Sequence, residues 1–302
     1  MHHITTTDWL TTPDGNPRGY IDTLSLKELW IHTGTDCNLG CPFCFEDSKP
    51  GDTRIELIAF DEAKRYIDEA VALGVEKLSF TGGEPFVNTD FLKILDYALD
   101  YKPCMVLTNG TGPIRTVFDD VIKLQSKKYD LKFRVSIDYP NEKEHDASRG
   151  KGNFRMSFET LSLMHKNGFA VSIARYGRQS EDKNAVEDRF REIFQEYNLP
   201  ADTNIIVFYN LFKAHKSVEV PFVSENCMTT YKDEKSRAEF MCAYSRMIVK
   251  KNGSTGVYAC TLVDDDEDYD LGKTIAETLG VRVMLKHHRC YSCFAAGTCC
   301  SE

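Results

Sequence analysis

Short apolar runs recur along the first two thirds of the chain, and longer segments between them carry apolar residues at helical spacing. The runs predict six β-strands, most of them about 30–40 residues apart, which is the period of repeated βα units. Regular alternation of strand and helix predicts a parallel sheet covered by helices, and six units are too few for a closed eightfold barrel. The strands are expected at Leu29–Thr33, Lys77–Thr81, Met105–Thr108, Phe133–Asp138, Ala170–Ala174 and Asn204–Phe208.

The intervening segments each place an apolar stripe on one helical face, which predicts helices packed on the sheet. After about Leu211 this pattern ends, and the charged stretch Lys213–Phe240 is expected to be irregular. A hairpin is expected over Met247–Tyr258, followed by a short helix near Lys273–Leu279. We therefore expect an N-terminal extension at 1–24, a β/α domain at 25–215 and a smaller C-terminal domain at 216–302.

Composition narrows the function classes that fit the chain. Its 302 residues carry a net charge of -9, which is unfavourable for nucleic-acid binding through phosphate neutralisation. The sequence has neither an apolar run of membrane-spanning length nor a signal-peptide pattern, so we expect a cytoplasmic protein. Eleven cysteines, an odd number, argue against a disulfide framework. Grouped cysteines in such a chain indicate metal or iron–sulfur ligation.

The first cysteine group follows the first predicted strand and has the spacing CX3CX2C. Its members, Cys37, Cys41 and Cys44, are suited to bind three irons of a [4Fe–4S] cluster and leave the fourth iron open. A zinc site or buried, inert cysteines are the alternatives. The second strand ends in Gly82–Pro85, whose glycines would let a ligand approach the backbone.

These motifs resemble the signature of the radical S-adenosylmethionine (SAM) enzymes: CX3CX2C with Phe43 before the third cysteine, followed by Gly-Gly-Glu-Pro. The resemblance implies a partial (β/α)6 TIM-like barrel over residues 25–215. It also implies a [4Fe–4S] cluster that binds SAM and cleaves it reductively to a hydrogen-abstracting 5′-deoxyadenosyl radical. The side chains and backbone expected to hold SAM are those of Phe43, Gly82, Gly83, Glu84, Asn109, Ser136, Arg149 and Tyr209. Family members have a glycine where Tyr139 stands here.

The second cysteine group lies near the C-terminus, where Cys242 and Cys260 flank the predicted hairpin and Cys290 and Cys293 form a CxxC. Such a set can bind zinc or a cubane cluster. It resembles the Twitch module, a shortened SPASM domain with a β-hairpin and a helix, which implies one auxiliary [4Fe–4S] cluster. A second auxiliary cluster would need the remaining C-terminal cysteines, Cys227, Cys299 and Cys300. A zinc ribbon remains the structural alternative.

Several polar residues near these motifs have two interpretations. Sulfatase-maturing relatives carry an aspartate where Thr261 stands, which counts against that activity, and Asp264–Asp266 is expected to be a solvated acidic loop. His287 and His288 could ligate metal, but a basic cap on a cluster or a helix end is expected. Arg175 and Arg178 could hold a substrate anion or form salt bridges, and we expect Cys104 to be a buried, inert thiol.

The sequence therefore predicts a radical SAM oxidoreductase, with flavodoxin or ferredoxin as its electron donor. The auxiliary cluster would accept an electron from the substrate radical or anchor the substrate. Only about 25 residues precede the first strand, too few for the leader-binding domain of many peptide-modifying relatives, so a small-molecule substrate is expected. A peptide maturase is the enzymatic alternative, and a non-catalytic iron–sulfur or zinc-binding protein is the alternative from another class.

Overall fold

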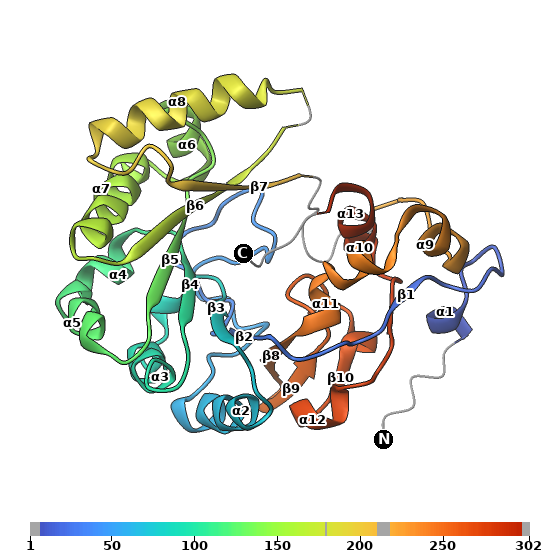
Figure 1. Ribbon diagram of the computed structural model, residues 1–302. Coiled ribbons are helices and arrows are strands. Elements are labelled where there is room, and N and C mark those ends of the chain that lie inside the picture. Colours follow the sequence, from blue (N-terminus) through green and yellow to red (C-terminus); the bar gives the residue numbers. More distant parts are fainter. Residues whose placement is uncertain (1–6, 179, 210–217, 298–302) are drawn as a thin grey trace.

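The computed structural model describes residues 7–178, 180–209 and 218–297, and a nine-stranded sheet forms the centre of this part (Figure 1). Six parallel strands follow one another in chain order, as predicted, so each strand pairs with the next. They are β2 (Glu28–His32), β3 (Lys77–Thr81), β4 (Cys104–Thr108), β5 (Leu131–Ser136), β6 (Ala170–Tyr176) and β7 (Asn204–Phe208). The mixed α/β fold with a curved parallel sheet is thus confirmed, with strand ends that differ from the predictions by at most two residues.

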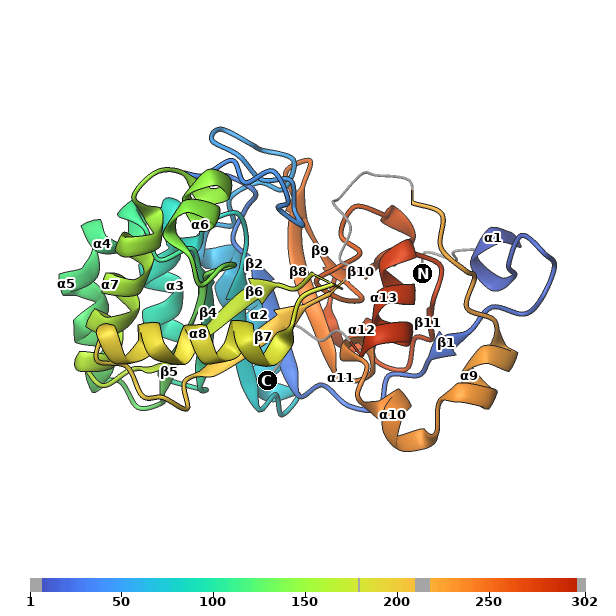
Figure 2. The ribbon, with the colours of Figure 1, turned by 90° about the horizontal axis from the view of Figure 1, so that it is seen from above.

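Helices cover the outer face of this sheet (Figures 1 and 2). Alternate strand residues explain the layering, because neighbouring side chains of a strand point to opposite faces. Leu29 and Ile31 pack into the core beneath the helices, whereas Trp30 between them packs into a second core inside the sheet. The helices are α2 (Phe60–Ala72), α3 (Phe91–Ala98), α4 (Gly112–Thr116), α5 (Phe118–Lys123), α6 (Glu142–Arg149), α7 (Asn153–Lys166) and α8 (Lys183–Glu196), with 3-10 turns η1 (Pro85–Val87) and η2 (Leu124–Ser126).

The predicted C-terminal hairpin extends the same sheet. It consists of β8 (Ser245–Lys251) and β9 (Ser254–Tyr258), and its turn residues Asn252 and Gly253 both have positive φ, as a type I′ turn requires. β8 pairs in parallel with β2, and β10 (Asp270–Gly272) pairs with β9. This continuation was not expected, because the hydrophobic pattern of a strand does not reveal its neighbour in the sheet.

The remaining C-terminal elements form a second lobe beside the sheet (Figure 2). The stretch expected to be irregular contains two helices in its described part, α9 (Glu225–Tyr231) and α10 (Glu234–Ala238). Their N-caps, Ser224 and Asp233, accept hydrogen bonds from backbone amides. That expectation was wrong, because short capped helices carry little periodicity. The other elements are α11 (Met241–Tyr244), η3 (Glu267–Tyr269), α12 (Ile275–Thr278), β11 (Val283–Met284) and α13 (His288–Ala296).

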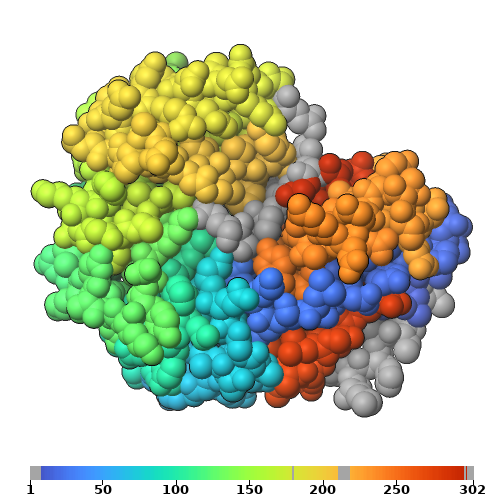
Figure 3. Space-filling model, viewed as in Figure 1, coloured from blue at the N-terminus to red at the C-terminus, as the bar shows by residue number. Residues whose placement is uncertain are grey.

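The N-terminal segment belongs spatially with this lobe. β1 (Tyr20–Ile21) pairs with β11, and Trp9 in α1 (Thr7–Leu10) packs edge-on against Tyr269 at 5.0 Å. Figure 3 shows this segment lying across the C-terminal residues. None of the described helices has the length and apolar character needed to cross a membrane. The domain boundaries at 24 and 215 stay predictions.

Candidate functional site: two cysteine-lined cavities

The first cysteine loop lines a cavity of about 160 Å³ inside the curved sheet. Cys37, Cys41 and Cys44 all face this cavity, which also receives residues from the carboxyl ends of β3 to β6. Chemistry in parallel β/α folds collects at this edge, because the loops after the strands meet there. The structure thus brings the three cysteines together.

Burial keeps these three thiols neutral in the metal-free chain. It raises the pKa of Cys37 to about 12, and the nearby Glu84, Cys41 and Cys44 raise it further. The pKa values of Cys41 and Cys44 are also raised by burial, while the charge of Arg149 acts in the opposite direction. A bound metal centre stabilises the thiolate form, so metal loading would release protons from this loop.

The glycines after β3 allow close packing against the cysteine loop. A Cβ on Gly83 would lie 2.4 Å from the carbonyl oxygen of Asp36, and a Cβ on Gly82 would lie 2.5 Å from Oγ1 of Thr33. Both glycines line the cavity, and the Gly83 amide donates a hydrogen bond to the carbonyl of Gly34. Small size is therefore required here for backbone packing, independently of any ligand.

Glu84 has a structural environment that the sequence did not indicate. Its side chain is buried and accepts hydrogen bonds from Thr108 Oγ1 at 2.8 Å, the Asn109 amide at 2.7 Å and the Phe86 amide at 3.3 Å. Burial nevertheless raises its pKa to about 7. The carboxyl group joins the end of β3 to the end of β4, and the structure does not place it among the residues lining the cavity.

Four other residues expected to hold SAM line the cavity: Phe43, Asn109, Ser136 and Arg149. The guanidinium of Arg149 lies 5.5 Å from the centre of the Phe43 ring and bonds to Asp138 at 2.5 Å. Burial disfavours the charge of Arg149, but the Asp138 carboxylate opposes this effect and the pKa of Arg149 is raised. Their contacts with SAM stay predictions.

Tyr209 is not brought to the cavity. Its ring lies against Gly177 and beneath the ammonium group of Lys183 at 4.7 Å. The preceding residue, Phe208, lines the cavity instead. A shift of one residue along a strand reverses the direction of the side chain, and strand alternation could have indicated this.

The second cysteine group lines a neighbouring cavity. Its four members come from distant parts of the C-terminal sequence, yet Cys242, Cys260, Cys290 and Cys293 all face one small space. Burial raises the pKa of Cys260 well above its ordinary value and that of Cys290 to about 11. Cys227 does not line this cavity and lies 3.2 Å from Ser224 Oγ, while Cys299 and Cys300 lie outside the described residues.

Two residues near the second cavity were missed by the sequence reasoning. Tyr269 is fully buried, and its hydroxyl lies 3.5 Å from Cys290 Sγ. Arg246 is also fully buried and donates to the carbonyl of Cys242 at 3.0 Å. Burial lowers the pKa of Arg246 to about 10, while Cys242 and Cys260 oppose this effect. Isolated residues of these kinds carry no motif, so only the folded structure identifies them.

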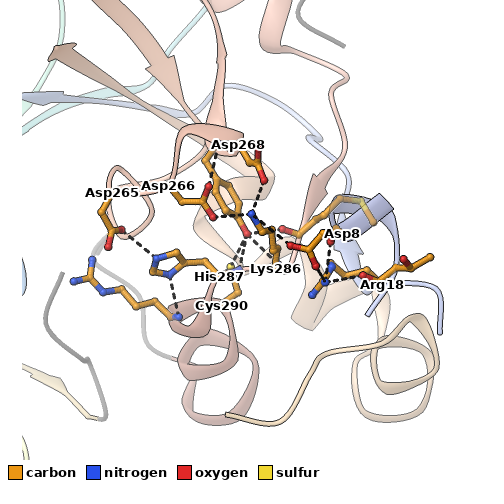
Figure 4. Close-up of polar contacts among 12 residues, drawn as sticks. Asp8, Arg18, Asp265, Asp266, Asp268, Lys286, His287 and Cys290 are labelled. Atoms are coloured by element: carbon orange, nitrogen blue, oxygen red, sulfur yellow. Dashed lines mark hydrogen bonds and ion pairs between the residues drawn. The ribbon is translucent and has the colours of Figure 1, made fainter. Parts of the chain in front are cut away.

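The acidic run near the second cavity is not a solvated loop. Asp264 is buried, and the Asp265 side chain is 5% exposed and pairs with His287 Nε2 at 3.1 Å. Lys286 bonds to Asp266 at 3.2 Å and to Asp268 on the same turn (Figure 4). The expectation of a solvated run was wrong, because Asp265 and Asp266 have partners in the segment before α13. Burial raises the pKa of Asp264 well above its ordinary value, which favours its neutral form.

The remaining polar candidates have internal partners. Arg175 is buried, lines the first cavity and bonds to Glu181 at 2.5 Å, and Arg178 lies 3.6 Å from Glu144, so both arginines have a carboxylate partner. Cys104 is buried, as predicted.

Three polar side chains that line the first cavity lack hydrogen-bond partners among the described residues. Trp30 Nε1, Ser48 Oγ and Thr261 Oγ1 are buried, line the first cavity and have no hydrogen-bond partner in the described part of the chain. Buried polar groups are almost always hydrogen-bonded, so this part of the cavity fits a polar ligand. The cavity therefore offers three cysteine ligands for a metal centre and unpartnered polar groups for a polar organic molecule.

The described residues contain no three Cys, His, Asp or Glu side chains gathered around one point as a single metal ion requires. A cubane cluster takes its cysteines at separate corners, so each ligand binds a different iron. Both cavities therefore have the donor set for such clusters.

The fold and this site define a β/α domain with a three-cysteine loop at the carboxyl edge of its sheet. The profile of the Radical SAM superfamily matches residues 31–193, more than half of the chain. The chain belongs to the radical SAM superfamily, whose members use a [4Fe–4S] cluster and SAM. The resemblance seen in the sequence is thereby confirmed.

Three relatives of 32–33% identity match less than half of the chain. It is 32% identical to the antilisterial bacteriocin subtilosin biosynthesis protein AlbA of Bacillus subtilis, over 46% of this chain and 30% of AlbA. It is 33% identical to the mycofactocin maturase MftC of Mycolicibacterium smegmatis, over 44% of this chain and 33% of MftC. An AdoMet-dependent heme synthase of Methanosarcina barkeri is 32% identical over 45% of this chain and 38% of the synthase. The matches thus span about a third of each relative.

Crystal structures share the fold over a larger part of the chain. Streptococcus suis SuiB bound to its precursor peptide SuiA has a TM-score of 0.61 at 15% identity, covering 86% of this chain and 66% of SuiB. The structure of anSMEcpe with bound AdoMet has a TM-score of 0.60 at 14% identity, covering 87% of this chain and 82% of that chain. At these identities the likeness supports the fold alone.

Proposed function

We propose that this chain is a radical SAM enzyme that oxidises a peptide, with Cys37, Cys41 and Cys44 holding the catalytic [4Fe–4S] cluster. The observation that carries the proposal is one cavity lined by these cysteines together with Gly82, Gly83, Ser136 and Arg149. When bound, the cluster and SAM supply a 5′-deoxyadenosyl radical that abstracts hydrogen from the substrate.

The chain's own groups have separate tasks in this proposal. The backbone of Gly82 and Gly83 and the Asn109 side chain border the space for SAM. Arg149, oriented by Asp138, supplies the positive charge for the SAM carboxylate. Trp30 and Thr261 line the same cavity with polar groups that have no partner among the described residues, and a substrate carbonyl would find a partner there.

Four cysteines of the C-terminal lobe would hold one auxiliary [4Fe–4S] cluster beside the substrate. Their common cavity supports this assignment, and a zinc site is the outcome that metal analysis would distinguish. The members of this ligand set are Cys242, Cys260, Cys290 and Cys293.

A peptide substrate now has more support than the small molecule favoured by the sequence. AlbA acts in the biosynthesis of a bacteriocin, MftC is named a maturase, and SuiB was crystallised with a precursor peptide. The second candidate is oxidation of a small molecule, which the similarity to a heme synthase favours. The electron donor, flavodoxin or ferredoxin, and the cytoplasmic location stay predictions.

Iron analysis tests the two cluster assignments. After anaerobic reconstitution, we expect about eight irons per chain in the wild type and about four when either cysteine group is replaced by alanine. Cys104→Ala is the matched control and should retain all eight. About four irons in the wild type, with zinc bound to the C-terminal cysteines, would refute the auxiliary cluster.

Production of 5′-deoxyadenosine from SAM under strong reductant tests the catalytic proposal. Size-fractionated extract supplies candidate substrates, and each fraction is assayed before and after protease treatment. Stimulation by a fraction that protease abolishes supports a peptide, whereas stimulation that survives protease supports the small molecule. Absence of SAM cleavage in the iron-loaded chain would refute the activity.

A further inference from the structure

One buried arginine connects the loops of the two cysteine sites. Arg289 lies in the first turn of α13, and its side chain is fully buried. Nη2 donates a hydrogen bond to the carbonyl oxygen of Phe45 at 2.5 Å, and Nη1 donates to that of Leu262 at 3.1 Å. Phe45 directly follows Cys44, and Leu262 is two residues after Cys260. The guanidinium therefore holds the backbone beside one cysteine of each site.

The two cavities are neighbours at this point. Leu262 lines both of them, so a single side chain forms part of the wall that separates them. Phe45 lines the first cavity and Arg289 lines the second. Arg289 therefore forms hydrogen bonds to the backbone of residues that line the two cavities.

Buried charge makes this connection stiff. The Glu46 side chain lines the first cavity and lies near Arg289, so their opposite charges attract. Hydrogen bonds from a charged donor are about twice as strong as neutral ones. Breaking these two hydrogen bonds would leave the buried guanidinium with fewer acceptors, which is unfavourable.

The loop held by Arg289 also shapes the space for SAM. The rings of Phe43 and Phe45 pack against Tyr176 at centroid distances of 6.1 and 6.4 Å, and all three residues line the first cavity. In the sequence, Arg289 directly precedes Cys290, and both residues lie in α13. Metal binding at Cys290 would fix the start of this helix and hence the arginine.

We infer that Arg289 is a positioning residue through which filling of the auxiliary site strengthens SAM binding in the first cavity. This inference rests on the proposed function, because it requires a cluster in each cavity. It assigns to the auxiliary site an effect on SAM affinity in addition to any contact with substrate.

A thermodynamic cycle tests this coupling without measuring turnover. SAM dissociation constants are measured anaerobically by calorimetry on four iron-loaded chains: wild type, Cys290→Ala/Cys293→Ala, Arg289→Met, and the combination. Loss of the auxiliary site should weaken SAM binding about tenfold when Arg289 is present, which lies within the usual range of coupling between sites. In the Arg289→Met background the same loss should change binding less than about twofold.

The controls separate failure of this inference from failure of the proposed function. Arg282→Met removes an exposed arginine of the same lobe that pairs with Asp22 at 3.0 Å, and it should leave the tenfold effect intact. Arg289→Lys, which can reach one carbonyl, replaces the methionine variant if that variant does not fold. In the lysine background, loss of the auxiliary site should weaken SAM binding by less than in the wild type. An equal effect in both backgrounds, or none with Arg289 present, overturns the coupling. Absence of SAM binding to every chain refutes the proposed function itself.

Discussion

Replacement of Glu84 by glutamine should remove a pH-dependent part of the stability. The folded protein raises the pKa of this carboxyl from an ordinary value of 4.5 to about 7, chiefly through burial. Below about pH 4.5 the group is protonated in both the folded and the unfolded chain and has no effect. Between pH 4.5 and 7 the unfolded chain loses the proton first, so stability falls as pH rises. Above about pH 7 the carboxyl group is ionised in both the folded and the unfolded chain, so the stability no longer changes with pH through this group.

The size of this effect follows from the difference between the two pKa values. At about 1.4 kcal/mol for each tenfold change in proton affinity, the wild type should lose about 3 kcal/mol relative to Glu84→Gln from pH 4.5 to 8. Glutamine can accept from the Asn109 amide and donate to Thr108 Oγ1, but the Phe86 amide loses its acceptor. We therefore expect a constant cost of about 1 kcal/mol as well.

Urea unfolding of the metal-free protein, followed by circular dichroism at pH 5, 6, 7 and 8, measures this difference. Metal-free protein is required because a cluster would add charge close to the carboxyl. Glu76→Gln, at an exposed position, controls for the loss of one carboxylate. A difference between wild type and Glu84→Gln that is independent of pH, or that grows in favour of the wild type at high pH, would refute the reasoning.

Three further substitutions test other parts of the site. Gly83→Ala places a Cβ 2.4 Å from a backbone oxygen and should lower stability by about 1–3 kcal/mol in thermal unfolding. The control Gly112→Ala adds a Cβ in open space and should change stability by less than about 0.5 kcal/mol. Equal losses in the two variants would contradict the packing argument. Arg149→Lys should weaken SAM binding about tenfold in calorimetry with iron content unchanged, because lysine cannot match the planar guanidinium; an unaltered dissociation constant would remove Arg149 from the SAM site. Cys104→Ala should leave iron and sulfide per chain at the wild-type level, and a loss of iron would reveal a missed ligand.

Much of the barrel could be predicted because its signals are local. Each parallel strand is an apolar run between helical stripes, and the six predicted strands overlap β2 to β7. The three cysteines of CX3CX2C lie on one loop, so their spacing alone brings them together. The parallel pairing of β8 with β2 could not be predicted, since it joins residues more than 200 positions apart and depends on packing.

The acidic run shows where a local interpretation fails. Acidic residues in sequence usually indicate exposure, yet Asp264 is buried with a raised pKa, and the Asp265 side chain is 5% exposed because His287 comes from another segment to face it. Solvation of a charged residue depends on partners that only the folded chain supplies. The same holds for Glu84, whose role in joining two strand ends is not visible in the Gly-Gly-Glu-Pro motif.

By itself, the sequence determined the family, the order of the parallel strands and the seven cysteines of the two groups. These features depend on residue type and on short spacing, which the chain carries whether or not it is folded. Tertiary structure decided that the two groups line adjacent cavities, that Leu262 separates them and that Arg289 bonds to both loops. Such contacts join segments distant in the chain, and no local pattern encodes which segments meet when the core closes.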